Sequence, residues 1–349
     1  MKRIFFVFLT LLTAVSGFSQ SQLQPVATVN LTRTEAITVG QLRAEVDKMG
    51  TAANRTLTRE ERRQVLDVMI NERLVLQAAE RDRVSVTENE VNAQIQELRT
   101  AMAQQLGRQP TDAQFAQAIR EEMGMEMAAF REQLRRQMIV QKYLLHRKGD
   151  MINNISRPTD AEILAEYNLR RTELVRPETI RFSMIQVPYG ADAASRTRAR
   201  TLADSLLREI GNDPSKFDEV SARSVSPNSG FQAGDAGYLP RNAEARAVVG
   251  QAFMDVAFTL RQGQVSRLIE GVSGFQIIKV TENYSEKRLE LTDPVQPGTR
   301  ITVREYIGQF LLTQRQQAIL AQASQELVEE LRGPANRRTF TVMENNLNW

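Results

Sequence analysis

The sequence contains no cysteine and only one histidine, and these two facts exclude several kinds of protein. Without cysteine the chain cannot form disulfides, bind a metal through thiolates, use a thiol nucleophile or carry a lipid on an N-terminal cysteine. A Ser-His-Asp triad would have to use His146, and a metal site with several histidine ligands is impossible. We therefore expect neither a metal nor a small-molecule cofactor.

Aromatic residues are also scarce, and neither sign of charge dominates. Aromatic side chains make up 6% of the sequence and charged side chains 25%, with a formal net charge of +3. Lys2 and Arg3 contribute two of these charges, so a chain without them carries about +1. Nucleic-acid-binding surfaces usually produce a strong positive excess. We expect no nucleic-acid partner.

Long apolar runs are absent except near the N-terminus, where one extends from Ile4 to Val15. Basic residues precede it and small residues follow it: Lys2, Arg3, then Ser16, Gly17 and Ser19. This order is typical of a secretory signal peptide, and the run is too short to span a bilayer comfortably. We predict that residues 1–19 are a cleavable signal peptide, cut after Ser19 or Ser16. An uncleaved anchor is the alternative; otherwise the protein is expected to be exported and not membrane-spanning.

Helical signals dominate residues 20–176. Four segments open with a capping box, in which a Thr and a Glu or Gln three residues later bond to each other's backbone N–H groups. The pairs are Thr58/Glu61, Thr87/Glu90, Thr111/Gln114 and Thr159/Glu162. Apolar residues recur behind them at helical spacing. Residues 25–30 and 37–39 alternate like two short paired strands.

Residues 177–284 have the pattern of a small α+β unit. Strand patterns occur at residues 179–187, 264–269 and 275–280, and helical patterns at residues 194–210, 216–223 and 250–260. A Gly- and Ser-rich stretch, Ser224 to Pro240, is predicted to be a loop. No phosphate-binding helix follows this stretch.

The C-terminal segment, residues 285–349, contains one long predicted helix from Val303 to Leu331, ended by Gly333 and Pro334. Residues 338–343 are predicted to form a last strand. A long helix with an apolar stripe has to bury it, and the helical front of the chain is the nearest large apolar partner. We therefore predict that the C-terminal helix and strand pack on the N-terminal domain, with the middle unit inserted between them.

The motifs of the middle unit resemble those of the parvulin-type (PpiC or rotamase) prolyl isomerase domain. The matching stretches, in family order and spacing, are RFSMIQV at 181–187, Phe217 to Ser224, AGDAGYL at 233–239, Phe253 to Ser266 and GFQIIKV at 274–280. The whole layout is similar to exported folding factors of the SurA and PrsA kind. Because no cysteine is available for a lipid anchor, the chain is nearer to soluble SurA, which implies a periplasmic protein that is not a lipoprotein.

The resemblance also indicates which positions would form the isomerase site. Two family histidines are replaced by Met184 and Gln276, and the family's loop Asp or Cys falls on Ser226 or Pro227. Because the polar residues of the family's isomerase site are replaced here, the resemblance assigns no catalytic residues to this chain, and they are unknown.

The positions that line the family's proline pocket nevertheless remain apolar in this sequence. This apolar wall consists of Val249, Phe253 and Phe258, with Met184 and Gln276 completing the predicted substrate-binding set. Gln276 is interpreted either as a core amide bonded to Ser183 or to a backbone group, or as a hydrogen-bond donor to a substrate carbonyl.

Three functions follow as hypotheses. The first is a periplasmic chaperone that binds unfolded or partly folded outer-membrane proteins, with a parvulin-like domain of weak or no isomerase activity. The second is an active peptidyl-prolyl cis-trans isomerase acting on proline-containing peptides. The third is a structural adaptor in an envelope complex. The expected fold class is α+β: a helical SurA-like N-terminal domain completed by a C-terminal helix, plus a small parvulin-like domain.

Overall fold

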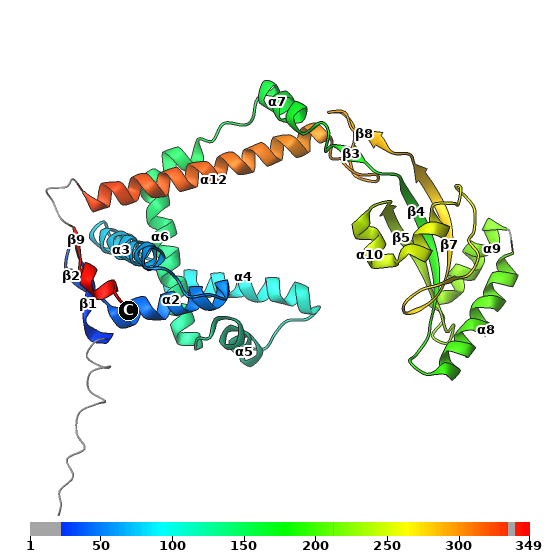
Figure 1. Cartoon of the computed structure of the whole chain (residues 1–349), viewed down its shortest axis with the longest axis horizontal. Helices are drawn as coiled ribbons and strands as arrows, with labels where there is room; N and C mark the ends of the chain where they lie inside the picture. The colour runs from blue at the N-terminus through cyan, green and yellow to red at the C-terminus, as the bar shows by residue number, and fades with distance from the viewer. Residues whose placement is uncertain (1–21, 212, 334–338) are drawn as a thin grey trace, which may run out of the picture. The chain divides into compact units, whose positions relative to one another are not determined.

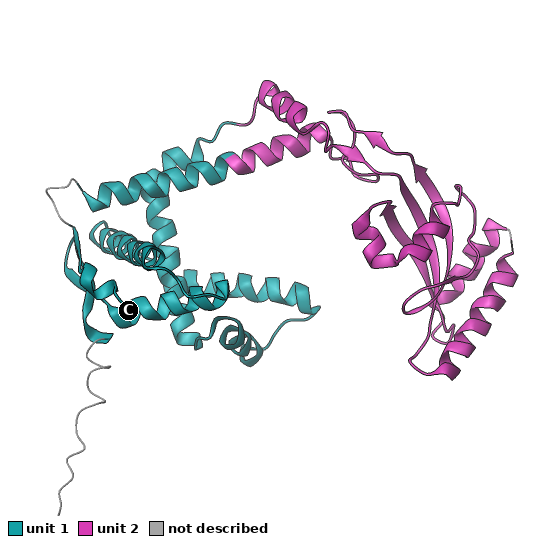
Figure 2. Cartoon of the chain, viewed as in Figure 1, with its two compact units in different colours: residues 1–156, 315–349 teal, residues 157–314 magenta. Residues whose placement is uncertain are grey.

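The structure, a computed structural model, describes residues 22–211, 213–333 and 339–349. The predicted signal peptide lies outside these residues. The chain divides into a helical unit, residues 1–156 and 315–349, and a second unit, residues 157–314 (Figure 2). The predicted fold class is confirmed, because the front and the C-terminal tail belong to one unit and the middle is inserted. The predicted segment limits stay predictions. None of the described helices is long and apolar enough to cross a bilayer.

The helical unit contains most of the predicted helices (Figure 1). They are α2 (Val39–Ala53), α3 (Arg59–Arg81), α4 (Glu88–Leu106), α5 (Asp112–Met123), α6 (Met127–Asn153) and the C-terminal part of α12 (Val303–Arg332). The capping boxes predicted at Thr58, Thr87 and Thr111 are formed, and a further one at Thr38 and Gln41 opens α2. These caps set the starts of the helices because they satisfy backbone N–H groups that have no partner within the helix.

A small antiparallel sheet joins the two ends of the helical unit. Its strands are β1 (Pro25–Asn30), β2 (Thr34–Thr38) and β9 (Phe340–Val342), in the order β2-β1-β9, and a short helix η2 (Glu344–Leu347) follows. The chain's front and tail therefore share backbone hydrogen bonds. The buried Gln77 of α3 accepts hydrogen bonds from the backbone N–H groups of Leu31 and Thr32, each at 3.1 Å, which fixes the turn between β1 and β2.

The helical unit has two apolar cores. The larger one combines β1, β2, α2 and α3 with Tyr143 of α6 and with Leu327, Leu331 and Leu347 of the tail. The smaller one joins α4, α5 and the first half of α6. The presence of Leu327 and Leu331 in the larger core confirms that the long C-terminal helix buries its apolar side chains against the N-terminal helices and strands.

The second unit begins with α7 (Asp160–Arg170), which packs on the start of α12. A two-stranded ribbon of β3 (Val175–Arg176) and β8 (Lys287–Arg288) lies at the entry to and exit from the parvulin-like part of the chain. A small core holds these elements together and includes Tyr167, Leu289 and Ile307.

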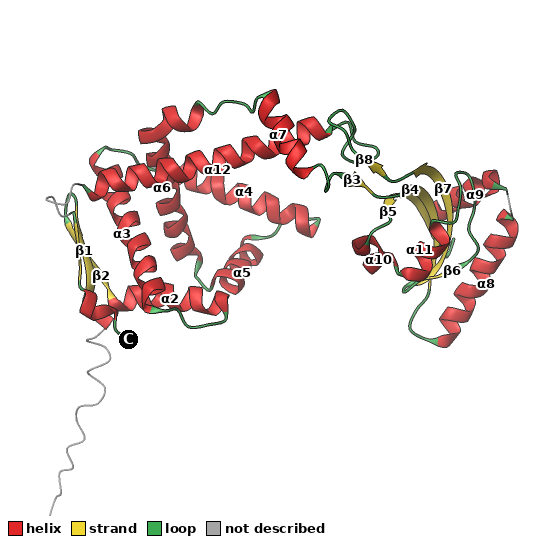
Figure 3. Cartoon of the chain, turned by 45° about the horizontal axis from the view of Figure 1, so that its top comes forward, coloured by secondary structure: helices red, strands yellow, loops and turns green. Residues whose placement is uncertain are grey.

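The parvulin-like part is a four-stranded antiparallel sheet covered on both faces (Figure 3). Its strands are β4 (Thr179–Pro188), β5 (Gln232–Pro240), β6 (Ile269–Glu270) and β7 (Gly274–Tyr284), in the order β5-β4-β7-β6, and its helices are α8 (Ala193–Ile210), α9 (Pro214–Ala222), η1 (Arg223–Val225), α10 (Ala243–Val249) and α11 (Gln251–Ala257). Helices α8 and α9 pack on one face through Ile185 and Ile277. Helix α11 packs on the other face through Phe253 and Met254.

Three sequence predictions in this part are wrong in detail. Residues 232–240, predicted as loop, form the edge strand β5. This strand tolerates glycine because it pairs with another strand on only one side. In addition, Gly237, at φ +80°, lies next to a bulge in that pairing. The helix predicted over 250–260 is the shorter α11, which ends at Ala257, and a second helix, α10, precedes it without having been predicted; Gly250, at φ +85°, separates the two. The strand predicted over 264–269 is reduced to an isolated bridge at Val265 and the short β6.

Candidate functional site

Met184 and Gln276 lie on neighbouring strands and point to the same face of the sheet. The register pairs Met184 of β4 with Ile278 of β7, and Gln186 with Gln276. Because side chains alternate between faces along a strand, Met184, Ile278 and Gln276 share a face, and Met184 and Gln276 are diagonal neighbours. The fold therefore brings together the two positions where the resemblance places histidines.

Phe253 forms the floor of this region from α11. Its side chain is only 3% exposed, and its ring packs edge-on against Phe182 of β4, with the ring centroids 5.6 Å apart. Phe182 was not among the predicted site residues, although it lies two residues before Met184 and alternation places it on the same face. A phenylalanine this deeply buried packs mainly in the core and presents little surface to a ligand.

The other predicted wall residues surround the same core. Met184, Val249 and Phe258 are half-buried and pack against the apolar cluster that contains Phe253. The guanidinium of Arg241 lies 5.4 Å from the centroid of the Phe258 ring. The structure thus gathers four of the five predicted substrate-binding side chains in one cluster.

Gln276 does not have the partner that the sequence analysis named. Ser183 pairs with Lys279 and so points to the opposite face, which excludes a bond between the Ser183 hydroxyl and the Gln276 amide. The Gln276 Oε1 atom is buried and has no hydrogen-bond partner among the described residues. Instead the amide lies flat against Gly271, where an added Cβ would meet Oε1 at 3.0 Å. Sequence alone gave no signal for this contact.

Ser226, the predicted loop position, lies apart from this apolar cluster. It is exposed and ends η1, where its backbone N–H donates to the Arg223 carbonyl at 3.1 Å. Its own carbonyl accepts from the backbone N–H of Ser229 at 3.0 Å. The residue therefore has a local role in shaping the loop.

Charged groups lie at the other end of β4. Arg181 bonds to Asp235 of β5 and to Glu282 of β7. The hydrogen bond from Arg181, assisted by one from the Gly237 N–H, holds the pKa of Asp235 below its ordinary value, so this carboxyl is a charged structural group. Glu282 accepts a hydrogen bond from Tyr284 and thereby raises the pKa of Tyr284 to about 12.

The two central side chains of the candidate site limit its chemistry. Neither the thioether of Met184 nor the carboxamide of Gln276 titrates near neutral pH. They can contribute shape, polarizability and one hydrogen-bonding amide, but they cannot transfer a proton. What remains is an apolar cluster with an unpartnered carbonyl oxygen beside it.

A second candidate site is a groove of about 660 Å³ between α2 and α3 in the helical unit. Its apolar lining includes Leu57, Val65 and Met69, and at its rim Met49 and Val68 are exposed to 52% and 66%. The charged side chains along it have ion-pair partners: Arg55 with Glu61, Arg136 with Glu72, Arg73 with Glu35 of β2, and Glu45 with Lys48. The groove is therefore an apolar surface with little net charge.

Comparison with known proteins assigns both parts of the chain. Residues 2–144 match the model of the SurA-like N-terminal domain, and residues 180–282 match that of the PPIC-type PPIase domain. Chaperone SurA of Chromohalobacter salexigens is 27% identical over 226 residues, which cover 65% of this chain and 48% of the relative. Chaperone SurA of Alcanivorax borkumensis is 30% identical over 226 residues, covering 63% and 47%. The chain spans about half the length of the curated relatives it matches.

Two solved structures are also similar. One is of the SurA-like chaperones PEB4 and Cj1289 of Campylobacter jejuni, with 12% identity and a TM-score of 0.37, covering 87% of this chain and 96% of that chain. The other is PrsA of Bacillus subtilis, with 20% identity and a TM-score of 0.25, covering 88% and 92%.

The fold and the matched domains define the class: a helical chaperone-type domain with an inserted isomerase-type domain. The chain therefore combines a SurA-like N-terminal domain with a PPIC-type domain and is similar to Chaperone SurA, as the motifs in the sequence predicted.

Proposed function

We propose that this protein is an exported, periplasmic chaperone for unfolded or partly folded outer-membrane proteins, and that its parvulin-like domain has weak or no isomerase activity. The SurA-like N-terminal domain supports the chaperone function. The N-terminal sequence, with its basic residues, apolar run and small residues, supports export. Binding would use no nucleotide, metal or other cofactor.

The observation that carries the proposal is the state of the isomerase site. Met184 and Gln276 are diagonal neighbours on one face of the sheet, at the positions where the family has histidines, and the Gln276 amide lies against Gly271. Rotation about an X–Pro bond faces a barrier of about 18–20 kcal/mol and requires stabilisation of the twisted amide. A site without the family's polar groups, and with Phe253 almost fully buried, offers little of that stabilisation.

A second candidate function, active prolyl isomerisation, is favoured by one observation: the apolar cluster around Phe253 is retained. Isomerisation needs no nucleophile or general base, so an apolar pocket that grips the proline ring can by itself lower the barrier. In that case Met184, Val249, Phe253, Phe258 and Gln276 would form the substrate-binding site, and the Gln276 amide would bond to a substrate carbonyl.

A peptide assay separates the two functions. We expect the mature protein to isomerise a series of Ala-Xaa-Pro-Phe peptides at no more than background rate. The double variant Met184→His/Gln276→His tests whether restoring the family histidines restores activity, and Phe253→Ala tests the pocket. A clear rate for the natural protein that Phe253→Ala abolishes would show that the domain is a working isomerase.

The proposed surface for unfolded chains is the groove between α2 and α3. An extended apolar segment can cover Met49 and Val68 without meeting an uncompensated charge, since the arginines of the groove are already paired. Methionine side chains adapt to many apolar shapes, which suits binding of varied sequences. An unfolded client loses conformational entropy when it binds, which weakens its affinity for the chaperone. Weak binding allows the client to dissociate rapidly, as a chaperone that delivers its clients requires.

A further inference from the structure

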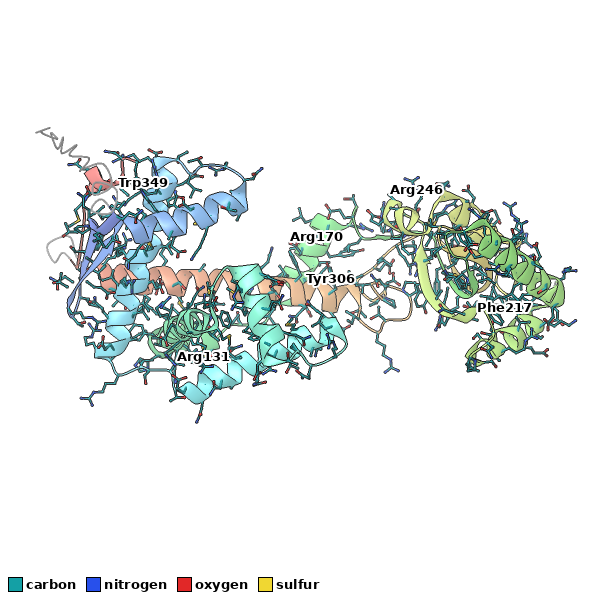
Figure 4. The ribbon with its side chains drawn as sticks, turned by 90° about the horizontal axis from the view of Figure 1, so that it is seen from below. Arg131, Arg170, Phe217, Arg246, Tyr306 and Trp349 are labelled. Carbon is teal, nitrogen blue, oxygen red and sulfur yellow. The ribbon has the colours of Figure 1, made fainter. Side chains whose placement is uncertain are left out.

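The single tryptophan of the chain, Trp349, lies at the C-terminal end of the helical unit (Figure 4), and two arginines of that unit stack on its ring. The guanidinium carbons of Arg43, on α2, and Arg62, on α3, each lie 4.6 Å from the centroid of the indole ring. All three side chains are half-buried. Stacking on an aromatic ring orients a guanidinium and leaves its N–H groups free to bond in the plane.

These two arginines differ from their neighbours because they have no acidic partner. Arg59 bonds to Glu344 at 3.4 Å and to Asn348 at 3.1 Å, and Arg63 bonds to Asp67 at 3.2 Å and to Glu344. Neither Arg43 nor Arg62 forms an ion pair with a described residue. The two guanidinium groups near this ring therefore have no ion-pair partner within the described part of the chain.

Three buried N–H groups in this cluster also lack an acceptor. They are the Nε groups of Arg43 and Arg62 and the Nε1 group of Trp349, each buried and without a hydrogen-bond partner among the described residues. Buried donors of this kind are usually satisfied, and leaving one unsatisfied costs about 1–3 kcal/mol. An oxygen atom from outside the described chain would satisfy them.

A cavity of about 480 Å³ lies beside the cluster and gives a ligand room to enter, and Arg43 stacks on the same indole ring from outside the cavity lining. Arg62 and Trp349 line one part of it, and the buried Val46 and Leu57 line another. The remaining wall is mostly the turn between α2 and α3, from Gly50 to Thr56. Asp47 is the acidic group among the lining residues; Arg55, also in the lining, is already paired with Glu61.

We propose that Arg43, Arg62 and Trp349 form a binding site for an organic carboxylate with a small apolar body, of the kind that a peptide presents at its C-terminus. The carboxylate accepts hydrogen bonds from the guanidinium and indole N–H groups, and the apolar body contacts Val46 and Leu57. Asp47 disfavours a small multiply charged anion, which cannot turn its charge away from that carboxylate. The site uses none of the residues of the isomerase region, and its cavity adjoins the groove, with which it shares Arg55 and Leu57. It goes beyond the proposed function.

Fluorescence of the mature protein tests the site directly, because Trp349 is the only tryptophan. An N-acetylated tripeptide with a free C-terminal carboxylate and a C-terminal valine is titrated, and the emission of the indole is recorded. We expect a saturable change, with affinity reduced about tenfold or more in Arg43→Gln and in Arg62→Gln, since each variant removes a charge-assisted hydrogen bond. The matched control Arg59→Gln, whose side chain already bonds to Glu344, should bind like the natural protein.

The peptide chemistry supplies the remaining controls. The same tripeptide with an amidated C-terminus, and inorganic phosphate, should produce no saturable change at the same concentrations. Equal binding of the amidated peptide would overturn the carboxylate assignment, and equal binding of phosphate would reduce the site to general attraction of anions. No saturable change with the free peptide, while circular dichroism shows a folded protein, would refute the site altogether.

Discussion

At the scale of single residues, Gln276 is the most informative position in the chain. Its carbonyl oxygen is buried without a partner among the residues that the structure describes, whereas its cross-strand neighbour Gln186 donates a hydrogen bond from Nε2 to Ser273 Oγ at 3.1 Å. A buried polar atom without a partner destabilises the fold. Such a residue is retained at a cost to stability, which is common at positions where a ligand binds.

This difference between two paired glutamines leads to a stability prediction. Gln276→Leu removes the unpartnered carbonyl and keeps the volume, so we expect the free energy of unfolding of the parvulin-like part to rise by about 1 kcal/mol. Gln186→Leu removes a hydrogen bond that is made and should be neutral or destabilising. Chemical denaturation of both variants measures the difference, and a loss of stability in Gln276→Leu would mean that the amide is satisfied in the folded protein.

At this scale the sequence motifs identify the residues of the candidate site but not the contacts that these residues make. The motif GFQIIKV located Gln276, and RFSMIQV located Met184. Their common face follows from the strand register, which depends on tertiary pairing and cannot be read from either motif alone. The contact between Gln276 and Gly271 also depends on that register. This is why the predicted partner Ser183 was wrong.

At the scale of elements, the capping boxes explain why the helices could be predicted well. Each box is a local pattern of a few residues, and the predicted helix begins at the predicted cap in α3, α4, α5 and α7. Strand β5 could not be predicted in this way because its residues have low strand propensity and it forms by pairing with β4. Helix α10 was missed because it is short and directly adjoins α11.

The C-terminal helix α12 allows a matched test of how the tail completes the helical unit. Leu327 is 2% exposed and belongs to the larger core, whereas Leu320 on the same helix is 43% exposed. Leu327→Ala should lower the free energy of unfolding of the helical unit by about 2–5 kcal/mol, because it leaves a cavity in the core. Leu320→Ala should change it by less than about 0.5 kcal/mol.

Trp349 emission during denaturation follows this unit specifically, since the residue packs on α2 and α3. Similar stabilities for the two leucine variants would contradict the assignment of α12 to the core of the helical unit. The pairing of β1 with β9 would then be the main remaining link between the front and the tail of the chain.

At the scale of the whole molecule, the helical unit and the parvulin-like domain differ in what each offers a client protein. The SurA-like domain offers an apolar groove with paired charges, and the parvulin-like domain keeps its core but not the polar groups of the family site. The central claim is therefore that client binding belongs to the helical unit and does not depend on isomerisation. The two units can be tested separately by substitutions within one full-length mature chain.

The measurement that tests this claim most directly is suppression of aggregation of an unfolded outer-membrane β-barrel protein. We expect the mature protein to suppress aggregation, and Val68→Asp, which places a charge in the groove, to weaken suppression at least about fivefold. Leu145→Asp, at a comparably exposed position on α6 outside the groove lining, serves as the matched control and should retain full suppression, as should Phe253→Ala. Loss of suppression in Phe253→Ala with no loss in Val68→Asp would contradict the account, because it would assign client binding to the parvulin-like domain.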